Sequence, residues 1–245
     1  MLVPIADGYG EAVPKMRPGC PAWRVITGDG KDLAKPDEDL GILRHAGVVL
    51  NFGRNETIFS EGDVAENIYR VVSGIVRLCK LLPDGRRQIA DFFLPGDFFG
   101  LIELETYAFS AEAVCPVTIL RYTRRHFEQL RDENRDLRNR IMTTLTRRLV
   151  AAQIHAVLLG RRTVKERIAA FLLQLAERGN REARDGDCLD LPMGRQDIAD
   201  YLGLTIETVC RALGEMKRAG LICVPNAHRI VLNDVRTLRA IVDVE

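Results

Sequence analysis

Residues 195–222 read RQDIADYLGLTIETVCRALGEMKRAGLI, and this stretch decides how the C-terminal part of the chain folds. Its apolar and small residues recur at helical spacing on both sides of Gly203, which predicts two short helices joined by a tight turn. Gly203 can take the positive φ that such a turn demands, and Thr205 is a natural N-cap for the second helix. A simple helical hairpin would share much of this pattern, but the combination favours a helix-turn-helix that binds DNA. We expect the inward side chains to be Ile198, Ala199, Leu202, Leu204, Val209, Ala212 and Leu213.

The second predicted helix turns a cysteine toward its charged side. Helical periodicity places Glu207, Cys210 and Arg211 on one face, opposite an apolar stripe. Free cysteine is usually buried, so a slightly rotated helix with its thiol in the core is the alternative. In a helix-turn-helix, the outward side chains near the start of the second helix touch base edges in the major groove. We therefore expect these three residues to read bases, with Arg211 donating to guanine and Glu207 accepting from cytosine.

Contacts to the DNA backbone would hold this unit in register. Residues 222–233, ICVPNAHRIVLN, predict a β-hairpin that forms a wing beside the second helix, with His228 near its tip. Polar and basic side chains around such a unit contact phosphates without reading sequence. We expect these contacts from Arg195, Gln196, Thr205, Lys217 and Arg229.

A run without glycine or proline precedes this unit, over residues 123–159. It predicts one helix of about 30 residues, roughly 45 Å long at 1.5 Å per residue. The alternative is a helix packed along its own domain, but a narrow apolar seam of this length better suits pairing with a second copy of the chain. The expected dimer interface is Ile141, Leu145, Leu149, Ala152 and Ala156.

Residues 39–122 change to short β-rich runs separated by turn signals. The sequence Pro83-Asp84-Gly85 between two such runs predicts a hairpin, because Asp-Gly tolerates the positive φ of tight turns. Strands at this spacing predict a sandwich or small barrel. Residues 1–38 are rich in glycine and proline, so we expect an irregular arm that contributes little to the core.

The composition limits the class of protein. The 245 residues carry 35 basic and 34 acidic side chains, so the net charge gives no general reason to bind a polyanion. The cysteines and histidines form no pair at metal-site spacing, so we expect no metal. No signal peptide or bilayer-spanning run is visible, which predicts a cytoplasmic protein without a membrane partner. No nucleophile, base and orienting acid form a constellation, which argues against an enzyme.

The order of these parts resembles one family. The segments VVSGIVRL at 71–78, PGDFFG at 95–100 and RQDIADYLGLTIETVCRAL at 195–213 resemble the Crp/Fnr superfamily of bacterial transcription regulators, and within it the FixK and Fnr-like members. The resemblance implies an α+β protein: an irregular arm at 1–38, a jelly-roll-like β-roll of the cyclic-nucleotide-binding type at 39–122, a dimerisation helix at 123–159 and a winged helix-turn-helix at 160–245. It also implies a homodimer that binds palindromic, TTGAT-like DNA sites, contacts RNA polymerase and activates low-oxygen, nitrogen-fixation or respiratory genes.

The resemblance also gives Cys210 a context. It implies that Glu207 and Arg211 occupy the two reading positions of the family's E-x-x-S-R motif, with Cys210 in place of the serine. Oxidation of this thiol to sulfinate or sulfonate would add negative charge and bulk at the DNA surface. We therefore hypothesise that Cys210 is redox-sensitive and that its oxidation weakens DNA binding.

The effectors of related regulators do not fit this chain well. Cyclic-AMP-binding members place a Glu after the FG pair and an Arg-Ser pair further on, where this chain has Leu101 and Phe109-Ser110. Members with a [4Fe–4S] cluster use four thiolates, where this chain offers Cys20 and Cys115. We therefore expect no cofactor and DNA binding without a small effector. The alternative is a sensor regulator of the same fold that holds an unrecognised haem, iron or nucleotide. The side chains expected to fill the pocket are Phe92, Phe98, Phe99 and Phe109.

Overall fold

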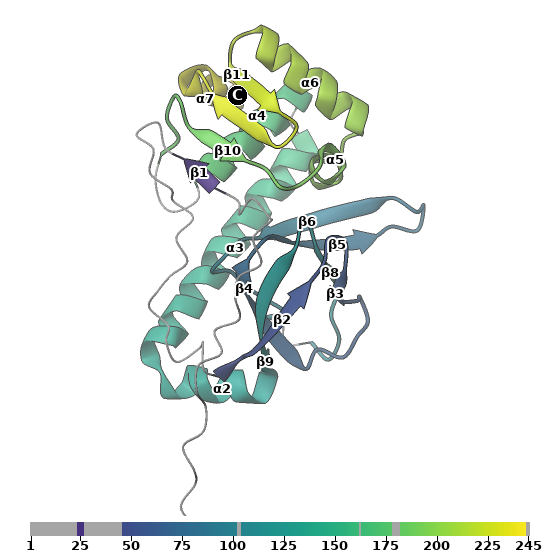
Figure 1. Cartoon of the computed structure of the whole chain (residues 1–245), viewed down its shortest axis with the longest axis vertical. Coiled ribbons are helices and arrows are strands. Elements are labelled where there is room, and N and C mark those ends of the chain that lie inside the picture. Colours follow the sequence, from purple (N-terminus) through teal and green to yellow (C-terminus); the bar gives the residue numbers. More distant parts are fainter. Residues whose placement is uncertain (1–23, 27–45, 102–103, 162, 178–181, 244–245) are drawn as a thin grey trace, which may run out of the picture.

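Two facing β-sheets make up the N-terminal half of the protein in the computed structural model, which describes residues 24–26, 46–101, 104–161, 163–177 and 182–243 (Figure 1). All strand pairs in both sheets are antiparallel. One sheet has the order β2 (Val48–Phe52), β9 (Val117–Thr123), β4 (Asn67–Ser73) and β7 (Phe98–Phe99). The other has the order β3 (Thr57–Phe59), β8 (Ser110–Ala113), β5 (Val76–Leu81) and β6 (Arg87–Phe93).

Aromatic rings fill the space between these two sheets. Phe59 stacks on Tyr107 with ring centroids 3.7 Å apart, and Tyr69 stacks on Phe99 at 5.0 Å. Side chains alternate between the faces of a strand, so each strand contributes every second residue to this interior. The β-roll predicted from the sequence is therefore present, and its interior is packed with side chains of the chain itself.

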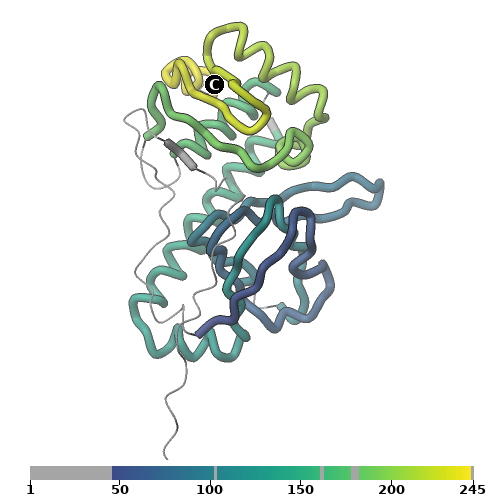
Figure 2. The backbone as a smooth tube through the Cα atoms, viewed as in Figure 1, coloured from purple at the N-terminus to yellow at the C-terminus, as the bar shows by residue number. Residues whose placement is uncertain are grey.

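The β5–β6 hairpin forms at the predicted Pro83-Asp84-Gly85 turn. Gly85 adopts a φ of 82°, and its N–H donates to the carbonyl of Leu82 at 2.9 Å. The Asp84 carboxylate accepts from the Arg86 backbone N–H at 3.0 Å and closes the turn further. The hairpin projects from the β-roll and passes beneath the C-terminal unit (Figure 2).

Two helices, rather than the single predicted one, connect the β-roll to the C-terminal unit. α2 (Arg124–Glu133) and α3 (Arg135–Arg161) are separated at Asn134, which has extended backbone angles. The Asn134 Oδ1 accepts from the Leu137 N–H at 3.0 Å, which makes Asn134 an N-cap for α3. The prediction of one helix over 123–159 is wrong at this position, because an asparagine cap can restart a helix without glycine or proline. No helix of the described segments is both long and apolar enough to cross a bilayer.

The C-terminal unit packs its helices against a small sheet. Its helices are α4 (Val164–Ala176), α5 (Arg195–Leu202), α6 (Ile206–Arg218) and α7 (Val235–Val242), and its strands include β10 (Cys188–Asp190), β11 (Ile222–Asn226) and β12 (Arg229–Leu232). A capping box starts α4: the Thr163 Oγ1 accepts from the Glu166 N–H, and the Glu166 carboxylate accepts from the Thr163 N–H at 3.1 Å. The buried core of the unit continues into the β-roll through Phe92, which contacts Tyr201.

A strand from the predicted N-terminal arm completes that small sheet. β1 (Arg24–Ile26) pairs antiparallel with β10, and the sheet has the order β1–β10–β12–β11. The expectation of an arm without regular structure is therefore wrong for these three residues. Strand addition uses backbone groups at the open edge of β10, which leave little trace in the sequence pattern of the added segment. The other residues of the arm lie outside the described segments.

Candidate nucleic-acid interface

The turn between α5 and α6 has the geometry that the sequence predicts. Gly203 takes a φ of 63°, and its N–H donates to the carbonyl of Ala199 at the end of α5. The Leu204 N–H donates to the same carbonyl at 3.0 Å. Thr205 then begins α6 as its N-cap, because its Oγ1 accepts from the Thr208 N–H at 3.2 Å. These local bonds fix the angle between the two helices.

The inward faces of α5 and α6 form one core, as predicted. Ala199 is small enough to let α6 approach α5 closely, and Leu204 is half-buried beside the turn. The remaining predicted inward side chains are buried: Ile198, Ala199, Leu202, Val209, Ala212 and Leu213. Packing of this stripe leaves the opposite face of α6 free.

The three predicted base-reading residues lie on that free face. Glu207, Cys210 and Arg211 are all exposed in the first two turns of α6. The alternative of a rotated helix with a buried thiol is wrong, because Val209 and Leu213 occupy the core instead. The helix thus presents an acceptor at Glu207, a small side chain at Cys210 and the guanidinium donors of Arg211. Their contact with DNA bases stays a prediction.

The environment of Cys210 differs from that of most other cysteines. Burial raises the pKa of the Cys79 thiol to about 11, and burial also raises the pKa of Cys188. Cys115 is buried too, whereas Cys210 and Cys223 are the exposed thiols of the described residues. Cys20 lies outside the described residues. Exposure is what an oxidant requires, so the structure makes Cys210 accessible to one.

Four of the five predicted phosphate contacts are exposed, namely Gln196, Thr205, Lys217 and Arg229. Gln196 and Thr205 lie at the starts of α5 and α6, and Lys217 lies in the last turn of α6. The Gln196 Nε2 donates to the Asp200 Oδ1 at 2.6 Å, so its amide is held along α5.

Arg195 lies differently from the expectation. Burial lowers the pKa of its guanidinium, and its Nη1 atom is closed off from solvent. The side chain lines a hollow of about 220 Å³ together with Cys210, Gly214, Lys217 and Val224. Helical periodicity does not indicate that this cation lies beside Cys210, because the two residues belong to different helices.

The predicted phosphate contact at the wing already has a partner. Arg229 donates through Nε to the Asp190 Oδ1 at 2.7 Å and through Nη2 to the Asp190 Oδ2 at 3.2 Å. These contacts raise the pKa of Arg229. The two residues are register partners on neighbouring strands. His228 is also anchored, with its Nδ1 3.0 Å from the Leu191 carbonyl oxygen. A phosphate would have to compete with Asp190 for Arg229.

A second hollow, which was not predicted from the sequence, adjoins the exposed face of α6 at Arg211. It has a volume of about 450 Å³ and lies between the start of α4 and α6, with Thr163, Lys165, Thr208 and Arg211 among its lining residues. Lys165 is exposed and lies 3.6 Å from the Glu215 carboxylate. The capping pattern Thr163-Val-Lys-Glu166 is the sequence signal that could have placed a helix start here.

The predicted dimer seam on α3 is partly inside the protein. Ile141 is only 5% exposed and packs with Phe98, Leu137 and Phe127 of its own chain, so its assignment to a dimer interface is wrong. Leu145, Leu149, Ala152 and Ala156 are exposed. The exposed large apolar side chains of α3 are Met142, Leu145, Leu149, Val150, Ile154 and Val157.

The four phenylalanines expected to fill one effector pocket lie in different places. Phe99 is in the interior of the β-roll, whereas Phe98 packs on Phe127 of α2 and Phe92 on Tyr201 of α5. Phe109 is half-buried, and the Lys80 Nζ lies 5.7 Å from its ring centroid. The expectation of a shared pocket is therefore wrong. No group of three or more histidine, cysteine or acidic side chains that could hold a metal occurs among the described residues.

Known proteins share both halves of this chain. Residues 49–134 match the family described as "Cyclic nucleotide-binding domain", and residues 166–241 match "Crp-like helix-turn-helix domain". The "Nitrogen fixation regulation protein FixK" of Bradyrhizobium diazoefficiens is 43% identical over 198 residues, which are 81% of this chain and 84% of that protein. The "Transcriptional activator protein FnrL" of Cereibacter sphaeroides is 32% identical over 82% of this chain and 83% of that protein.

A solved structure agrees with these relatives. The structure of FixK2 from Bradyrhizobium japonicum superposes with a TM-score of 0.73 and 38% sequence identity, over 81% of this chain and 98% of that one. The relatives of this chain named above are transcription regulators rather than enzymes. With both domain types and this likeness in place, the chain belongs to the Crp/Fnr superfamily of transcription regulators, among its FixK-like members.

Proposed function

We propose that this protein is a homodimeric transcription activator that reads DNA through Glu207, Cys210 and Arg211. The observation that carries the proposal is the exposed face of α6, where these side chains stand beyond a buried stripe. Arginine donates two bonds to guanine, glutamate accepts from cytosine, and the small thiol between them permits close approach. Gln196, Thr205 and Lys217 are exposed around this face, and we propose that they contact DNA phosphates. The half-buried Arg195 adds positive charge beside Cys210.

The dimer rests on the exposed apolar face of α3. Leu149 is 61% exposed although it lies in the middle of the helix, and Met142 and Leu145 are exposed on the same side of the helix in the two preceding turns. Such a stripe on a soluble protein marks an interaction surface. A second copy of α3 supplies the same stripe, and a two-fold dimer places two reading helices on a palindromic site one helical turn apart. We propose that the half-sites are TTGAT-like, because Glu207 and Arg211 occupy the two reading positions of the E-x-x-S-R motif.

The regulated genes are inferred from the relatives. FixK of Bradyrhizobium diazoefficiens is named for nitrogen fixation, and FnrL of Cereibacter sphaeroides is named an activator. We extend low-oxygen, respiratory or nitrogen-fixation control to this chain as part of the proposal. Contact with RNA polymerase belongs to the proposal as well, through the turn at 84–87, which projects from the β-roll and is exposed at 84–86 (Figure 2).

DNA binding without a small effector is the form of regulation we favour. Stacked rings of Phe59, Tyr69, Phe99 and Tyr107 fill the interior of the β-roll. Oxidation of the exposed Cys210 is the proposed signal that reaches the DNA surface directly. A stoichiometric chromophore or nucleotide in protein purified without oxygen would contradict the effector-free part of this proposal.

Selection of DNA sites from a random pool tests the proposed reading face. We expect the purified protein to select palindromes, and Arg211→Lys to relax selectivity at one base pair of each half-site by about 1–3 kcal/mol, because lysine cannot donate in bidentate fashion to guanine. Arg218→Lys is the matched control, since Arg218 is exposed in the last turn of the same helix. Equal selectivity in the Arg211→Lys variant and the wild type would contradict the assigned reading position.

A further inference from the structure

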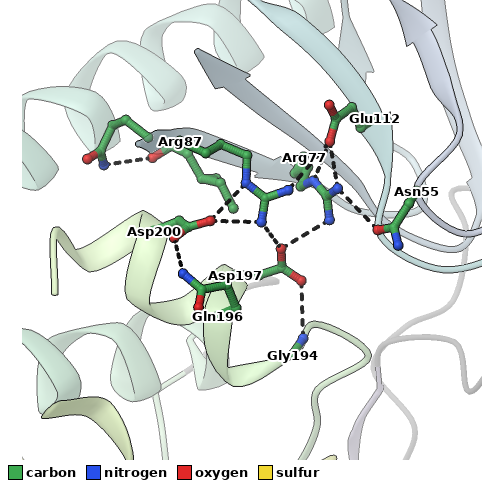
Figure 3. Close-up of polar contacts among 10 residues, drawn as sticks. Asn55, Arg77, Arg87, Glu112, Gly194, Gln196, Asp197 and Asp200 are labelled. Atoms are coloured by element: carbon green, nitrogen blue, oxygen red, sulfur yellow. Dashed lines mark hydrogen bonds and ion pairs between the residues drawn. The ribbon is translucent and has the colours of Figure 1, made fainter. Parts of the chain in front are cut away.

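A cluster of charged side chains joins the β-roll to the first helix of the helix-turn-helix (Figure 3). Its two cations lie on neighbouring strands: Arg77 on β5 and Arg87 on β6. Its three carboxylates are Glu112 on β8 and Asp197 and Asp200 on α5. We call these five residues the interdomain cluster. The cluster joins parts of the chain that are 110 and 120 residues apart in sequence.

Arg77 is the buried centre of the interdomain cluster. Only 4% of the residue is exposed, and its Nη1 lies 3.0 Å from the Asp197 Oδ1. Its Nε and Nη2 donate to the Glu112 Oε2 at 2.8 and 2.6 Å, and Nη2 also donates to the Asn55 Oδ1 at 3.1 Å. A buried charge is tolerated only when it is paired and hydrogen-bonded in this way. The position of Asp197 is therefore tied to the β-roll.

Arg87 binds both carboxylates of α5. Its Nη2 lies 2.8 Å from the Asp197 Oδ1, and its Nε donates to the Asp200 Oδ2 at 2.8 Å. The neighbouring Gln88 donates through Nε2 to the Tyr201 carbonyl oxygen at 3.3 Å. Without Arg87, three carboxylates would face one guanidinium, and like charges would push α5 away from the β-roll.

Each α5 carboxylate also has a second oxygen, which accepts a hydrogen bond from within the C-terminal unit. The Asp197 Oδ2 accepts from the Gly194 N–H at 3.2 Å, which holds the N-terminal end of α5. The Asp200 Oδ1 accepts from the Gln196 Nε2 at 2.6 Å. Gln196 is a proposed phosphate contact, so a continuous path of hydrogen bonds runs from the β-roll to the DNA-binding surface (Figure 3).

We propose that Arg77 and Arg87 are positioning residues for DNA recognition. They fix the angle at which each helix-turn-helix is carried on its β-roll, and in the dimer this angle sets the separation of the two reading helices. The spacing between half-sites that the protein accepts then depends on side chains of the β-roll that touch no DNA. This inference rests on the proposed dimeric, DNA-binding function.

The test measures binding to a palindrome with its preferred spacer and to versions one base pair longer and shorter. We expect the wild type to prefer the natural spacer by about tenfold or more, and Arg87→Gln to reduce that preference by at least about threefold, because the joint is loosened. Arg86→Gln is the matched control: it removes the same charge one residue away, from a side chain that is 79% exposed and paired with Asp84 in its own turn. It should keep the wild-type preference.

A variant in the other domain separates positioning from a loss of folding. Asp200→Asn keeps an acceptor for Gln196 but removes the charge that Arg87 binds, so it should relax the spacer preference as Arg87→Gln does. The two changes together should relax it no further than Arg87→Gln alone, since Arg87→Gln already removes the cation that Asp200 binds. Faster amide hydrogen exchange in α5 of both variants, with far-ultraviolet circular dichroism unchanged, would accompany the effect.

The outcomes distinguish this inference from the proposed function. An unchanged spacer preference in folded Arg87→Gln or Asp200→Asn protein would overturn the inference while DNA binding stands. A uniform loss of affinity for all three spacers would overturn it too, because that result indicates a stability role alone. Failure of the wild-type protein to bind any palindrome would refute the proposed function, and this inference with it.

Discussion

At the scale of single residues, Cys210 is distinguished by what surrounds it. The thiol is exposed between Glu207 and Arg211, and it lines the same hollow as the half-buried Arg195. A sulfinate or sulfonate there would stand beside Arg195 and oppose the DNA phosphates. Two oxygen atoms or more would also occupy the space that a base pair needs.

The prediction for Cys210 is a loss of oxidant sensitivity on replacement. Peroxide treatment should weaken DNA binding by the wild type by about tenfold or more, an effect of about 1.4 kcal/mol or more, because it places a charge against the groove. Cys210→Ser should bind DNA and keep its affinity after the same treatment. Titration of binding by fluorescence anisotropy, before and after peroxide, measures both.

Cys223 supplies the control for this experiment. It is exposed on β11, so Cys223→Ser removes an accessible thiol outside the reading face. The hypothesis predicts that Cys223→Ser remains as sensitive as the wild type. Oxidant sensitivity that disappears with Cys223→Ser, or persists in Cys210→Ser, would reject Cys210 as the sensor.

Residue orientation was predictable where it follows from helical period. Glu207 and Arg211 are outward because Val209 and Leu213 must be inward on the same helix. The positions of the arginine side chains could not be predicted in this way. The pairing of Arg229 with Asp190 depends on strand register, and the burial of Arg195 depends on how α6 packs across α5.

At the scale of elements, α3 has two apolar faces, of which one packs on the β-roll and the other is exposed. One face packs on the β-roll through Leu137 and Ile141 and carries Arg148, whose guanidinium pairs with Asp91 and Asp97. Arg148 also lies 4.1 Å from the centroid of Phe93. The other face, which includes Leu149, is exposed in the single chain.

Leu149→Glu tests this second face. Burial of a leucine stabilises an interface by about 1.5–3 kcal/mol, and a carboxylate there would meet its own copy across the two-fold axis. We expect the dimer to dissociate at concentrations at least about tenfold higher than those of the wild type. Sedimentation velocity over a dilution series measures the change.

The matched control places the same charge on another exposed apolar residue. Val64 is 64% exposed on the β-roll, so Val64→Glu should leave the dimer intact. Both variants should retain their folded structure, because neither side chain belongs to a buried cluster. A Leu149→Glu protein that remains as dimeric as Val64→Glu would show that this face of α3 is not the interface.

Spacing alone identified α3 as a long amphipathic helix but not its boundaries or its faces. The predicted seam included Ile141 because the residue fits a narrow repeat, yet it packs on the chain's own β-roll. A helix with two apolar stripes shows the same repeat for both. Asn134 interrupts the helix by a side-chain cap that competes with the helical backbone, and a search for glycine and proline misses it.

At the scale of the whole molecule, an aromatic stack joins α3, the β-roll and the C-terminal unit. His155 of α3 stacks on Tyr201 of α5 with ring centroids 4.1 Å apart, and Phe92 of β6 contacts the same tyrosine at 5.3 Å. Both ring nitrogens of His155 are closed off from solvent. Burial lowers the pKa of His155, although the nearby Asp91 charge and the Tyr201 backbone act in the opposite direction.

This burial predicts that the free energy of unfolding falls in mild acid. A neutral buried histidine binds fewer protons in the folded state than in the unfolded state, whose pKa is about 6.5. Stability is therefore fully present above about pH 6.5 and decreases as the pH falls below that value. Thermal unfolding between about pH 7.5 and about pH 5.5 should show a smaller decrease in Tm for His155→Phe than for the wild type.

The phenylalanine keeps the stack on Tyr201 and removes the titration. His126→Phe is the control, because His126 is exposed on α2. It should show the wild-type decrease in Tm with pH. The explanation fails if His155→Phe loses as much stability in acid as the wild type does.

The sequence by itself determined the features that depend on near neighbours along the chain. These are the helix-turn-helix with its turn at Gly203, the hairpin at 83–85, the succession of strands, and the outward face of α6. Period and turn chemistry are local, so one sequence suffices to read them. Only the tertiary structure decided the β1–β10 pairing, which face of α3 stays exposed, and the pairing of Arg77 and Arg87 with Asp197. Those contacts join residues far apart in the chain. The sequence around a charged side chain does not identify its partner, because the fold alone brings the two together.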